Sequence, residues 1–448
     1  MSLPWSEIRD ALQAEPPVRL SGRVIRVGGL VLQGLMPGAK MGMMCRLHIP
    51  GAVESVPAEV VALRDGEVSL MPLSAVSGIT VGTEIEPVDH DPSVPVGDDM
   101  VGRVLDGWGR PIDGGAPLRA SARYPLQPPP LNPMERGLIE RPLSVGIRAV
   151  DGMLTCGEGQ RLVIMAGAGV GKSTMLGMMA RSTEADVTVV ALIGERSREV
   201  KSFVQQELGP DGLSRSVVVS STSNTSVALR IRAARTATAI AEYFRDQGLR
   251  VLLLMDSLTR VCMAQRELGL ATGEPPTTRG YPPSAFAIIP QLLERAGPGV
   301  NGGSITAYYT ALLESDDLGD PIGDAIRAVT DGHIVLSRKL AEQGHFPAID
   351  VLQSTSRVMS EVVSLNHRQA SADLRRVMAN LSEAEELQTF GAYRRGEVPR
   401  FDLAMDFGTP LRTYLRQLSD ESTRFEISRD ALLKMVEALR TSEQEMGI

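Results

Sequence analysis

The sequence predicts an α/β protein with a mainly parallel sheet in its core, a small β-barrel before the core and a helical domain after it. Short β-rich runs punctuated by Gly and Pro fill residues 18–88, and this spacing is typical of a small closed barrel. Beyond residue 133, apolar runs alternate with helical patterns, which indicates crossover units and parallel strands. After residue 364 only helical patterns remain.

The predicted elements follow in order along the chain. A first helical pattern carries Trp5, Ile8 and Leu12 on one face, and this face either packs on the chain's own body or docks a partner. A Pro-rich stretch at 124–133 is predicted to be an extended connector. The predicted barrel strands are 22–31, 43–49, 58–63, 68–71 and 83–88; the core strands are 160–166, 187–193, 217–220, 249–256, 304–313 and 333–337; the helices include 227–247, 368–390, 410–418 and 429–442.

The length of 448 residues suffices for about three domains at roughly 150 residues each. Such a chain buries large cores and needs no disulfide staples. We predict a docking or oligomerisation segment at 1–17, a β-barrel domain at 18–90, the core at 91–365 and a C-terminal helical domain at 366–448.

Composition argues against several classes of function. Hydrophobic residues make up 43% and charged residues 22% of the chain, which is ordinary for a folded soluble protein. The net charge of −8 and the aromatic content of 4% argue against nucleic acid as a partner. Cys45, Cys156 and Cys262 lie far apart without a CxxC pair, which argues against disulfides and a cysteine zinc site. We recognise no membrane span and no signal peptide, and we expect a cytoplasmic protein.

The strongest motif runs from Ala166 to Ser173, between an apolar strand and a helical pattern. It matches the phosphate-binding template GxxxxGK(S/T), except that Ala166 stands where the template has its first glycine. Glycines let backbone N–H groups turn toward a phosphate chain, Lys172 reaches the β- and γ-phosphates, and the Ser173 hydroxyl can bind Mg²⁺. The predicted ATP-binding residues of this loop are Gly167, Ala168, Gly169, Val170, Gly171, Lys172, Ser173 and Thr174.

Two carboxylates follow predicted strands of the core. Asp256 ends the buried run 251–256, where a carboxylate can hold Mg²⁺ through water next to the phosphate loop. Glu195, followed by Arg196, ends the strand 187–193, where it would face the γ-phosphate and polarise a water for in-line attack. A strand-end cap and a surface ion pair are the structural alternatives, and the phosphate loop upstream favours the catalytic interpretation.

Arg357 and Phe346 are two further candidates. Arg357 ends the segment Ser354-Thr355-Ser356-Arg357, and an arginine supplied by another subunit can stabilise the charge of a transferring phosphoryl group. Phe346 offers a flat apolar face to adenine. From spacing alone, a structural salt bridge is the commoner explanation for Arg357 and a core position is the commoner one for Phe346.

Together and in this order, these elements resemble the hexameric ATPases related to the catalytic subunit of rotary ATP synthase. The resemblance covers nearly the whole chain and is carried by residues 194–196, 256–260 and 354–357 and by Phe346. It implies a RecA-like P-loop core that binds Mg²⁺ with ATP. Because the chain carries both Glu195 and Arg357, one gene product could build every site of a homohexamer. The catalytic residues so implied are Lys172, Glu195, Arg196, Arg260 and Arg357, with Phe346 on adenine and with Ser173 and Asp256 on the metal.

One branch of that family, the type III secretion ATPases, is similar over longer segments. These segments are 274–284, 292–297, 331–338 and 391–393. Where the rotary catalytic subunit has an acidic segment, this chain has Arg394-Arg395-Gly396-Glu397-Val398-Pro399, which favours export over rotation. Residues 313–317 and 320–324 resemble the virulence injectisome enzymes, whereas 265–267 are closer to the flagellar export enzymes.

The alternatives kept beside the injectisome are a flagellar export ATPase, a rotary catalytic subunit and an RNA translocase of the Rho type. The last would need aromatic residues to bind RNA, and residues 18–88 contain no Phe, Tyr or Trp. For an export ATPase the resemblance implies release of chaperones from export substrates, and their unfolding, at an export gate on the cytoplasmic face of the inner membrane. It implies a stator or regulator on the N-terminal segment, a central stalk at the pore loop 280–284 and chaperone–substrate complexes on the C-terminal domain.

Overall fold

The computed structural model describes residues 21–74, 77–88, 92–313 and 319–447, and these form two compact units. One unit contains the residues up to Ser93 with the short segments 226–228 and 267–275, and the other contains the rest. The predicted helix with Trp5, Ile8 and Leu12 lies outside the described residues. The predicted domain boundaries stay a prediction.

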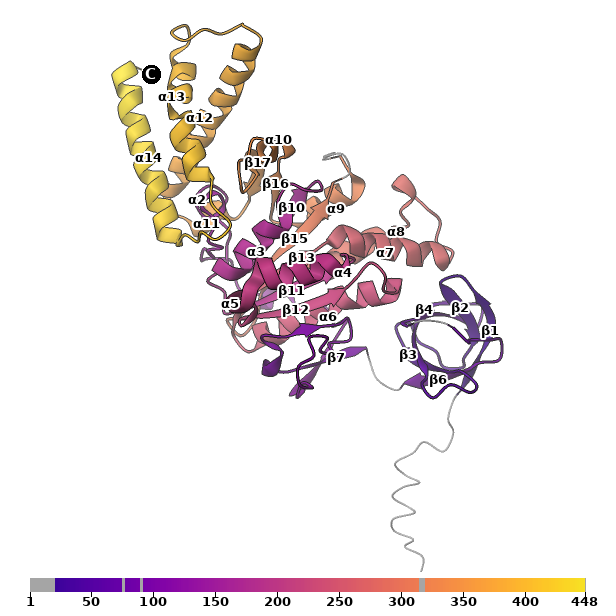
Figure 1. The fold of residues 1–448 in the computed structure, drawn as a ribbon. Coiled ribbons are helices and arrows are strands. Elements are labelled where there is room, and N and C mark those ends of the chain that lie inside the picture. Colours follow the sequence, from indigo (N-terminus) through magenta and orange to yellow (C-terminus); the bar gives the residue numbers. More distant parts are fainter. Residues whose placement is uncertain (1–20, 75–76, 89–91, 314–318, 448) are drawn as a thin grey trace, which may run out of the picture. The chain divides into compact units, whose positions relative to one another are not determined.

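The first unit is a closed barrel. Its described strands are β1 (Gly22–Gly28), β2 (Val31–Leu35), β3 (Met44–His48), β4 (Val56–Arg64), β5 (Glu67–Pro72) and β6 (Glu84–Val88). They pair antiparallel in the closed order β1-β2-β5-β4-β3-β6, which confirms the predicted barrel (Figure 1). Alternate residues such as Leu47, Leu70 and Ile85 are buried and fill the interior. A Cβ atom at Gly34 would lie 2.5 Å from the Ile85 side chain, so a larger residue there would displace this buried side chain.

The predicted first strand, 22–31, is wrong in its extent. The chain turns at Gly29, whose φ is +64°, and β2 runs back along β1 as a hairpin. Leu30 and Val31 continue the apolar run through and beyond this turn, although Leu30 is exposed. The apolar pattern alone therefore predicted one continuous strand, although the Gly28-Gly29 pair indicates a turn.

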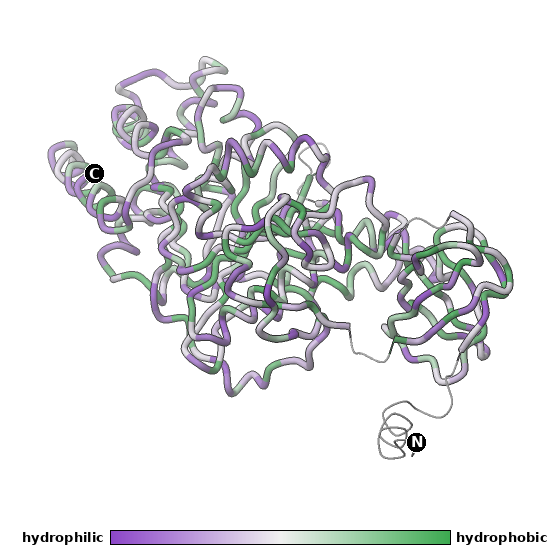
Figure 2. Tube along the Cα trace, turned by 60° about the horizontal axis from the view of Figure 1, so that its bottom comes forward, coloured by the Kyte–Doolittle hydropathy of each residue, from purple (hydrophilic) through white to green (hydrophobic). Residues whose placement is uncertain are grey.

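The second unit is built on a mainly parallel sheet. Its strands are β8 (Val104–Leu105), β10 (Arg161–Ala166), β11 (Val187–Ile193), β12 (Ser216–Ser221), β13 (Arg250–Asp256), β14 (Gly297–Pro298), β15 (Ser304–Leu312), β16 (Gly332–Leu336) and β17 (Ile349–Ser356). The strand order is β17-β16-β10-β15-β13-β11-β12-β8, and β14 pairs with β15. Strands β10, β11 and β13 are buried almost throughout, which explains their continuous apolar sequences. Figure 2 shows apolar stretches gathered inside this unit.

The sequence predicted the parallel strands β10, β11, β12, β13, β15 and β16, but it predicted neither the short parallel strand β8 nor β17. Strand β17 pairs antiparallel with β16 at the edge of the sheet, and its residues alternate irregularly between buried and exposed. An edge strand of this kind has no continuous apolar run, so the hydropathy signal was weak. A separate pair joins β7 (Ser93–Val96) to β9 (Ala122–Pro125).

Helices connect the strands of the second unit. They are α2 (Arg148–Met153), α3 (Lys172–Ser182), α4 (Ser197–Ser202), a π-helical turn (Phe203–Leu208), α5 (Gly209–Leu213), α6 (Val227–Asp246), α7 (Leu258–Ala271), α8 (Pro283–Leu293), α9 (Pro321–Val329), α10 (Arg338–Glu342) and α11 (Met359–Val362), with 3₁₀ turns at Asp98–Met100, Pro133–Glu135 and Thr278–Gly280. Among the described helices, none has the length and apolarity needed to cross a bilayer.

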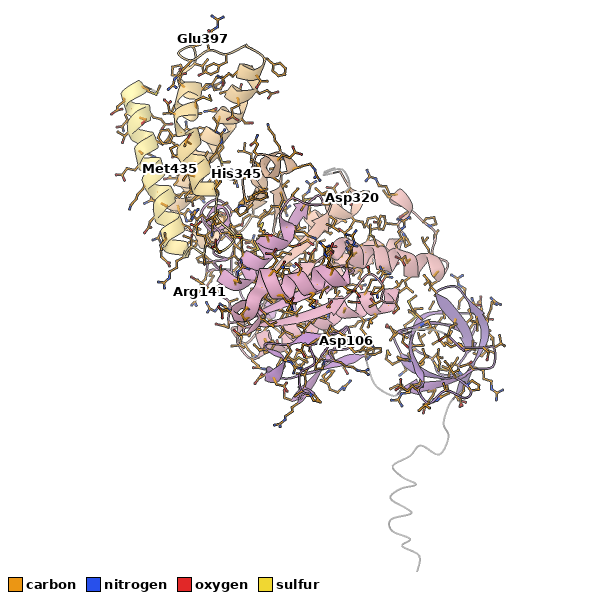
Figure 3. The ribbon with its side chains drawn as sticks, in the orientation of Figure 1. Asp106, Arg141, Asp320, His345, Glu397 and Met435 are labelled. Carbon is orange, nitrogen blue, oxygen red and sulfur yellow. The ribbon has the colours of Figure 1, made fainter. Side chains whose placement is uncertain are left out.

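The chain ends in a helical bundle made of α12 (Leu365–Thr389), α13 (Pro399–Leu415) and α14 (Phe425–Met446). This bundle confirms the predicted helical C-terminal region, but the predicted helix 410–418 begins too late. Pro399 starts α13 and Pro410 lies inside it, so the second proline was wrongly taken as a helix start. In Figure 3, Glu397 lies in the α12–α13 loop, at the end of the bundle away from α2.

Candidate functional site

The phosphate loop joins β10 to α3. Gly169 and Gly171 have φ values of +79° and +92°, in the left-handed region that favours glycine, and Gly171 caps the N-terminus of α3. Ala166 is the last residue of β10 and pairs in the sheet with Leu312 of β15 and Leu336 of β16. Its backbone is therefore a regular buried strand, and the departure from the template at Ala166 leaves the loop geometry intact. Ala168 and Gly169 are exposed, so their backbone is accessible to a ligand.

Lys172 lies between the two predicted carboxylates. Its Nζ atom donates a hydrogen bond to Asp256 and lies 4.0 Å from the Glu195 Oε1 atom. Asp256 ends β13 and Glu195 follows β11, and these strands are neighbours in the sheet. All three residues are nearly buried. The structure thus brings together residues up to 84 positions apart in sequence, at the carboxyl ends of parallel strands, where ligands bind in open α/β sheets.

Glu195 also contacts Arg260, whose Nε atom donates to the Glu195 Oε1 atom at 3.2 Å. Gly194 has a φ of +74°, and a Cβ atom there would lie 2.6 Å from the Arg260 side chain. Burial raises the pKa of Glu195 to about 7, a hydrogen bond with Glu199 and the nearby Asp256 charge act in the same direction, and Lys172 and Arg260 oppose them.

Arg196 lies apart from this cluster in the structure. Its side chain is 80% exposed and pairs with Glu199 at 3.3 Å, one turn along α4. Of the two predicted supporting arginines, Arg260 therefore contacts Glu195 and Arg196 does not.

Phe346 lies beside the phosphate loop, since its ring is 3.4 Å from the position of a Cβ atom built at Gly171. The side chain is 45% exposed, so Phe346 occupies no core position and presents a free apolar surface. A flat exposed ring next to a phosphate loop is a suitable contact for a nucleoside base.

Arg357 follows β17 and is exposed. The serines before it are anchored: Ser354 accepts a hydrogen bond from the Val335 N–H at 2.9 Å, and Ser356 donates to the Thr155 carbonyl at 2.8 Å. Within the described part of the chain, the Arg357 guanidinium forms no ion pair or hydrogen bond. Hydrogen bonds thus fix the segment before Arg357, while the arginine side chain itself is exposed. This does not support the alternative in which Arg357 forms a structural salt bridge.

Oxygen donors suitable for Mg²⁺ are present next to Lys172. The Ser173 hydroxyl is exposed at the start of α3, and the Asp256 carboxylate is an oxygen ligand of the kind that Mg²⁺ prefers. Mg²⁺ sites that take most of their ligands from phosphates and water need few protein oxygens. The residues present therefore fit the predicted metal. The Thr174 hydroxyl is not needed as a metal ligand, because it donates a hydrogen bond to Glu207 at 3.0 Å.

Thr310 also contacts the site, and it was not predicted from the sequence. Its Oγ1 atom donates a hydrogen bond to the Asp256 Oδ1 atom at 2.8 Å from the neighbouring strand β15. A threonine near the carboxyl end of a buried strand was the available signal, but strand order was needed to connect it with Asp256.

Family models match most of the chain. The nucleotide-binding domain of the ATP synthase alpha/beta family matches residues 146–356, and its beta-barrel domain matches 22–89. The C-terminal domain model of the EscN ATPase of type III secretion systems matches 363–434.

Whole-length relatives come from two kinds of export system. A type 3 secretion system ATPase of Sinorhizobium fredii is 49% identical over 90% of each chain. A flagellum-specific ATP synthase of Pseudomonas aeruginosa is 48% identical over 95% of each chain. The assembled EscN ATPase of enteropathogenic E. coli superposes with a TM-score of 0.87 at 44% identity, over 93% of this chain and 100% of that one. EscN in complex with its central stalk EscO superposes with a TM-score of 0.85.

Proposed function

Because the chain belongs to the type III secretion ATPase family and is an ATP-hydrolysing enzyme, we propose that it energises protein export by a virulence injectisome. ATP hydrolysis is supported above all by one observation: Lys172, Asp256 and Glu195 lie close together beside a glycine-rich phosphate loop. The match to the EscN C-terminal domain supports the injectisome. A flagellar export ATPase remains the second candidate, since relatives of both kinds are similarly close.

Lys172 is the main phosphate-binding side chain of the proposed site. In the structure this lysine is paired with Asp256, and we propose that it exchanges this partner for the β- and γ-phosphates of ATP. The backbone N–H groups of the phosphate loop and the start of α3 bind the same phosphates. Phe346 packs against the adenine. When bound with ATP, Mg²⁺ offsets phosphate charge, and Ser173 and Asp256 would hold it.

Glu195 is the proposed general base. Its carboxylate orients and polarises the water that attacks the γ-phosphate, and its raised pKa brings it close to the working pH, where a general base is most effective. Arg260 holds the Glu195 carboxylate in place. Arg196, which is exposed, would support the γ-phosphate only after its side chain leaves Glu199.

The ATPase activity at low ATP concentration should therefore rise with pH through about 7. Glu195 accepts a proton only as a carboxylate, and its raised pKa keeps it protonated and inactive below this range. Initial rates between about pH 5.5 and about pH 8.5 give the midpoint. Glu199→Gln removes one cause of the raised pKa and should move the midpoint to lower pH. A parent profile that is flat over this range contradicts the assignment.

Arg357 completes the site of a neighbouring subunit in the proposed homohexamer. Its exposed position at the edge strand supports this role, and the assembled EscN structures support the oligomer. An arginine supplied in this way stabilises the charge that spreads over the phosphoryl oxygens in the transition state.

Specific ATPase activity should accordingly increase with protein concentration, because each working site needs two subunits. The measurement is the turnover per subunit across a dilution series, with the oligomeric state followed by light scattering. Nucleotide binding by the loop should change little over the series. Constant turnover down to clearly monomeric protein contradicts the shared site.

We propose four further partners for the chain: a stalk, a stator, chaperone–substrate complexes and an export gate. A central stalk would contact the pore loop 280–284, as the complex of EscN with EscO supports. This loop is anchored at Arg279, which pairs at 3.4 Å with Asp320, labelled in Figure 3 at the start of α9. We also propose a stator on residues 1–17, chaperone–substrate complexes on the C-terminal bundle, and peripheral attachment to an export gate at the cytoplasmic face of the inner membrane.

A further inference from the structure

Thr310 lies between the phosphate-loop strand and the Asp256 strand. Strand β15 pairs with β10 on one side and with β13 on the other. In this register Thr310 stands opposite Ile164 of β10, while its neighbour Tyr309 stands opposite Met255 of β13. Thr310 is fully buried and lies near the carboxyl ends of these strands, where the site is.

The Thr310 hydroxyl and the Lys172 ammonium group share one acceptor, the Asp256 Oδ1 atom. Asp256 is itself buried, and a buried carboxylate needs hydrogen-bond donors that replace its lost hydration and fix its orientation. Lys172 is a long flexible donor that the phosphates of ATP also need. Thr310 is a short β-branched side chain whose rotamer is restricted on the strand, so its hydrogen bond does not depend on the position of Lys172.

We propose that Thr310 is a positioning residue for Asp256: its hydroxyl keeps the carboxylate oriented for Mg²⁺ when Lys172 turns to the phosphates. This inference rests on the proposed function, because it takes Asp256 as the carboxylate that holds the metal. Partners of this kind, bonded to a metal-holding group and not to the metal, commonly change metal affinity by about 10- to 100-fold when they are removed.

The test compares three variants in the full-length protein. Thr310→Val has nearly the same shape but no hydroxyl, and Thr310→Ser retains the hydroxyl. Thr306→Val is the matched control: Thr306 is equally buried on β15, and its hydroxyl accepts a hydrogen bond from the Gly159 N–H at 2.7 Å, away from Asp256. Each protein is titrated with Mg²⁺ in the presence of a fluorescent ATP analogue, and the binding signal is measured, which requires no turnover.

Thr310→Val should raise the Mg²⁺ concentration for half-maximal tightening of nucleotide binding by about 10-fold or more. Its binding of the analogue without Mg²⁺ should equal that of the parent, and Thr310→Ser and Thr306→Val should stay within about threefold of the parent. If Thr310→Val does not fold, Thr310→Ala replaces it in the same titration.

An unchanged Mg²⁺ requirement in Thr310→Val overturns the inference, and so does an equal loss in Thr310→Ser. If Mg²⁺ does not tighten nucleotide binding in the parent, the metal role of Asp256 is wrong and the inference falls with it. If the parent fails to bind the analogue at all, it is the proposed phosphate site that is wrong.

Discussion

We expect Glu195→Gln to abolish ATP turnover and to leave nucleotide binding intact. The amide has nearly the size of the carboxylate and can keep contact with Arg260, but it cannot accept a proton from water. Loss of a general base commonly costs about 10²- to 10⁴-fold in rate. Steady-state phosphate release measures turnover, and a fluorescent nucleotide measures binding.

A matched control is Glu184→Gln, which changes an exposed glutamate of the same unit and should leave both measurements unchanged. Hydrolysis by Glu195→Gln near the parent rate contradicts the assignment of the base. Loss of nucleotide binding would instead indicate that Glu195 maintains the site, since Lys172 lies 4.0 Å from it.

Arg357→Ala should reduce turnover by about 10³-fold or more with nearly unchanged nucleotide binding, because the arginine acts only on transition-state charge. Mixing Arg357→Ala chains with Glu195→Gln chains should then restore activity. A mixed interface can combine an intact Glu195 from one subunit with an intact Arg357 from its neighbour. Random assembly into rings makes about a quarter of the interfaces intact, which sets the expected ceiling for recovery.

The control for this experiment is a mixture of Glu195→Gln with Lys172→Ala. Both residues contribute to the same site from one subunit, since Lys172 lies 4.0 Å from Glu195. Every site in the mixture therefore lacks one of the two residues, and no activity should return. Activity in the first mixture and none in the second supports the shared site. No recovery in either mixture, with oligomers present, contradicts it.

The phosphate loop was predictable because its geometry is local. Strand, glycine-rich turn and helix follow one another within residues 161–182, and each is specified by its own short sequence. The barrel was predictable from the spacing of short strands, while the β1–β2 hairpin was misjudged because an apolar residue occupies the turn. The start of helix α13 was misjudged because Pro410, a residue type that often marks a helix start, lies inside a helix that already begins at Pro399.

Local sequence patterns were enough to identify the kind of chemistry: a lysine and a serine on a phosphate loop, carboxylates at strand ends and an arginine after Ser356. Which of these side chains come into contact follows from the fold, because side-chain proximity across a sheet depends on strand order and register, which no local pattern encodes. Strand order brings Asp256 and Glu195 close to Lys172, and register places Thr310 beside Asp256 on the neighbouring strand. Burial, which also follows from the sheet, raises the pKa of Glu195 toward the range in which it can act as a base.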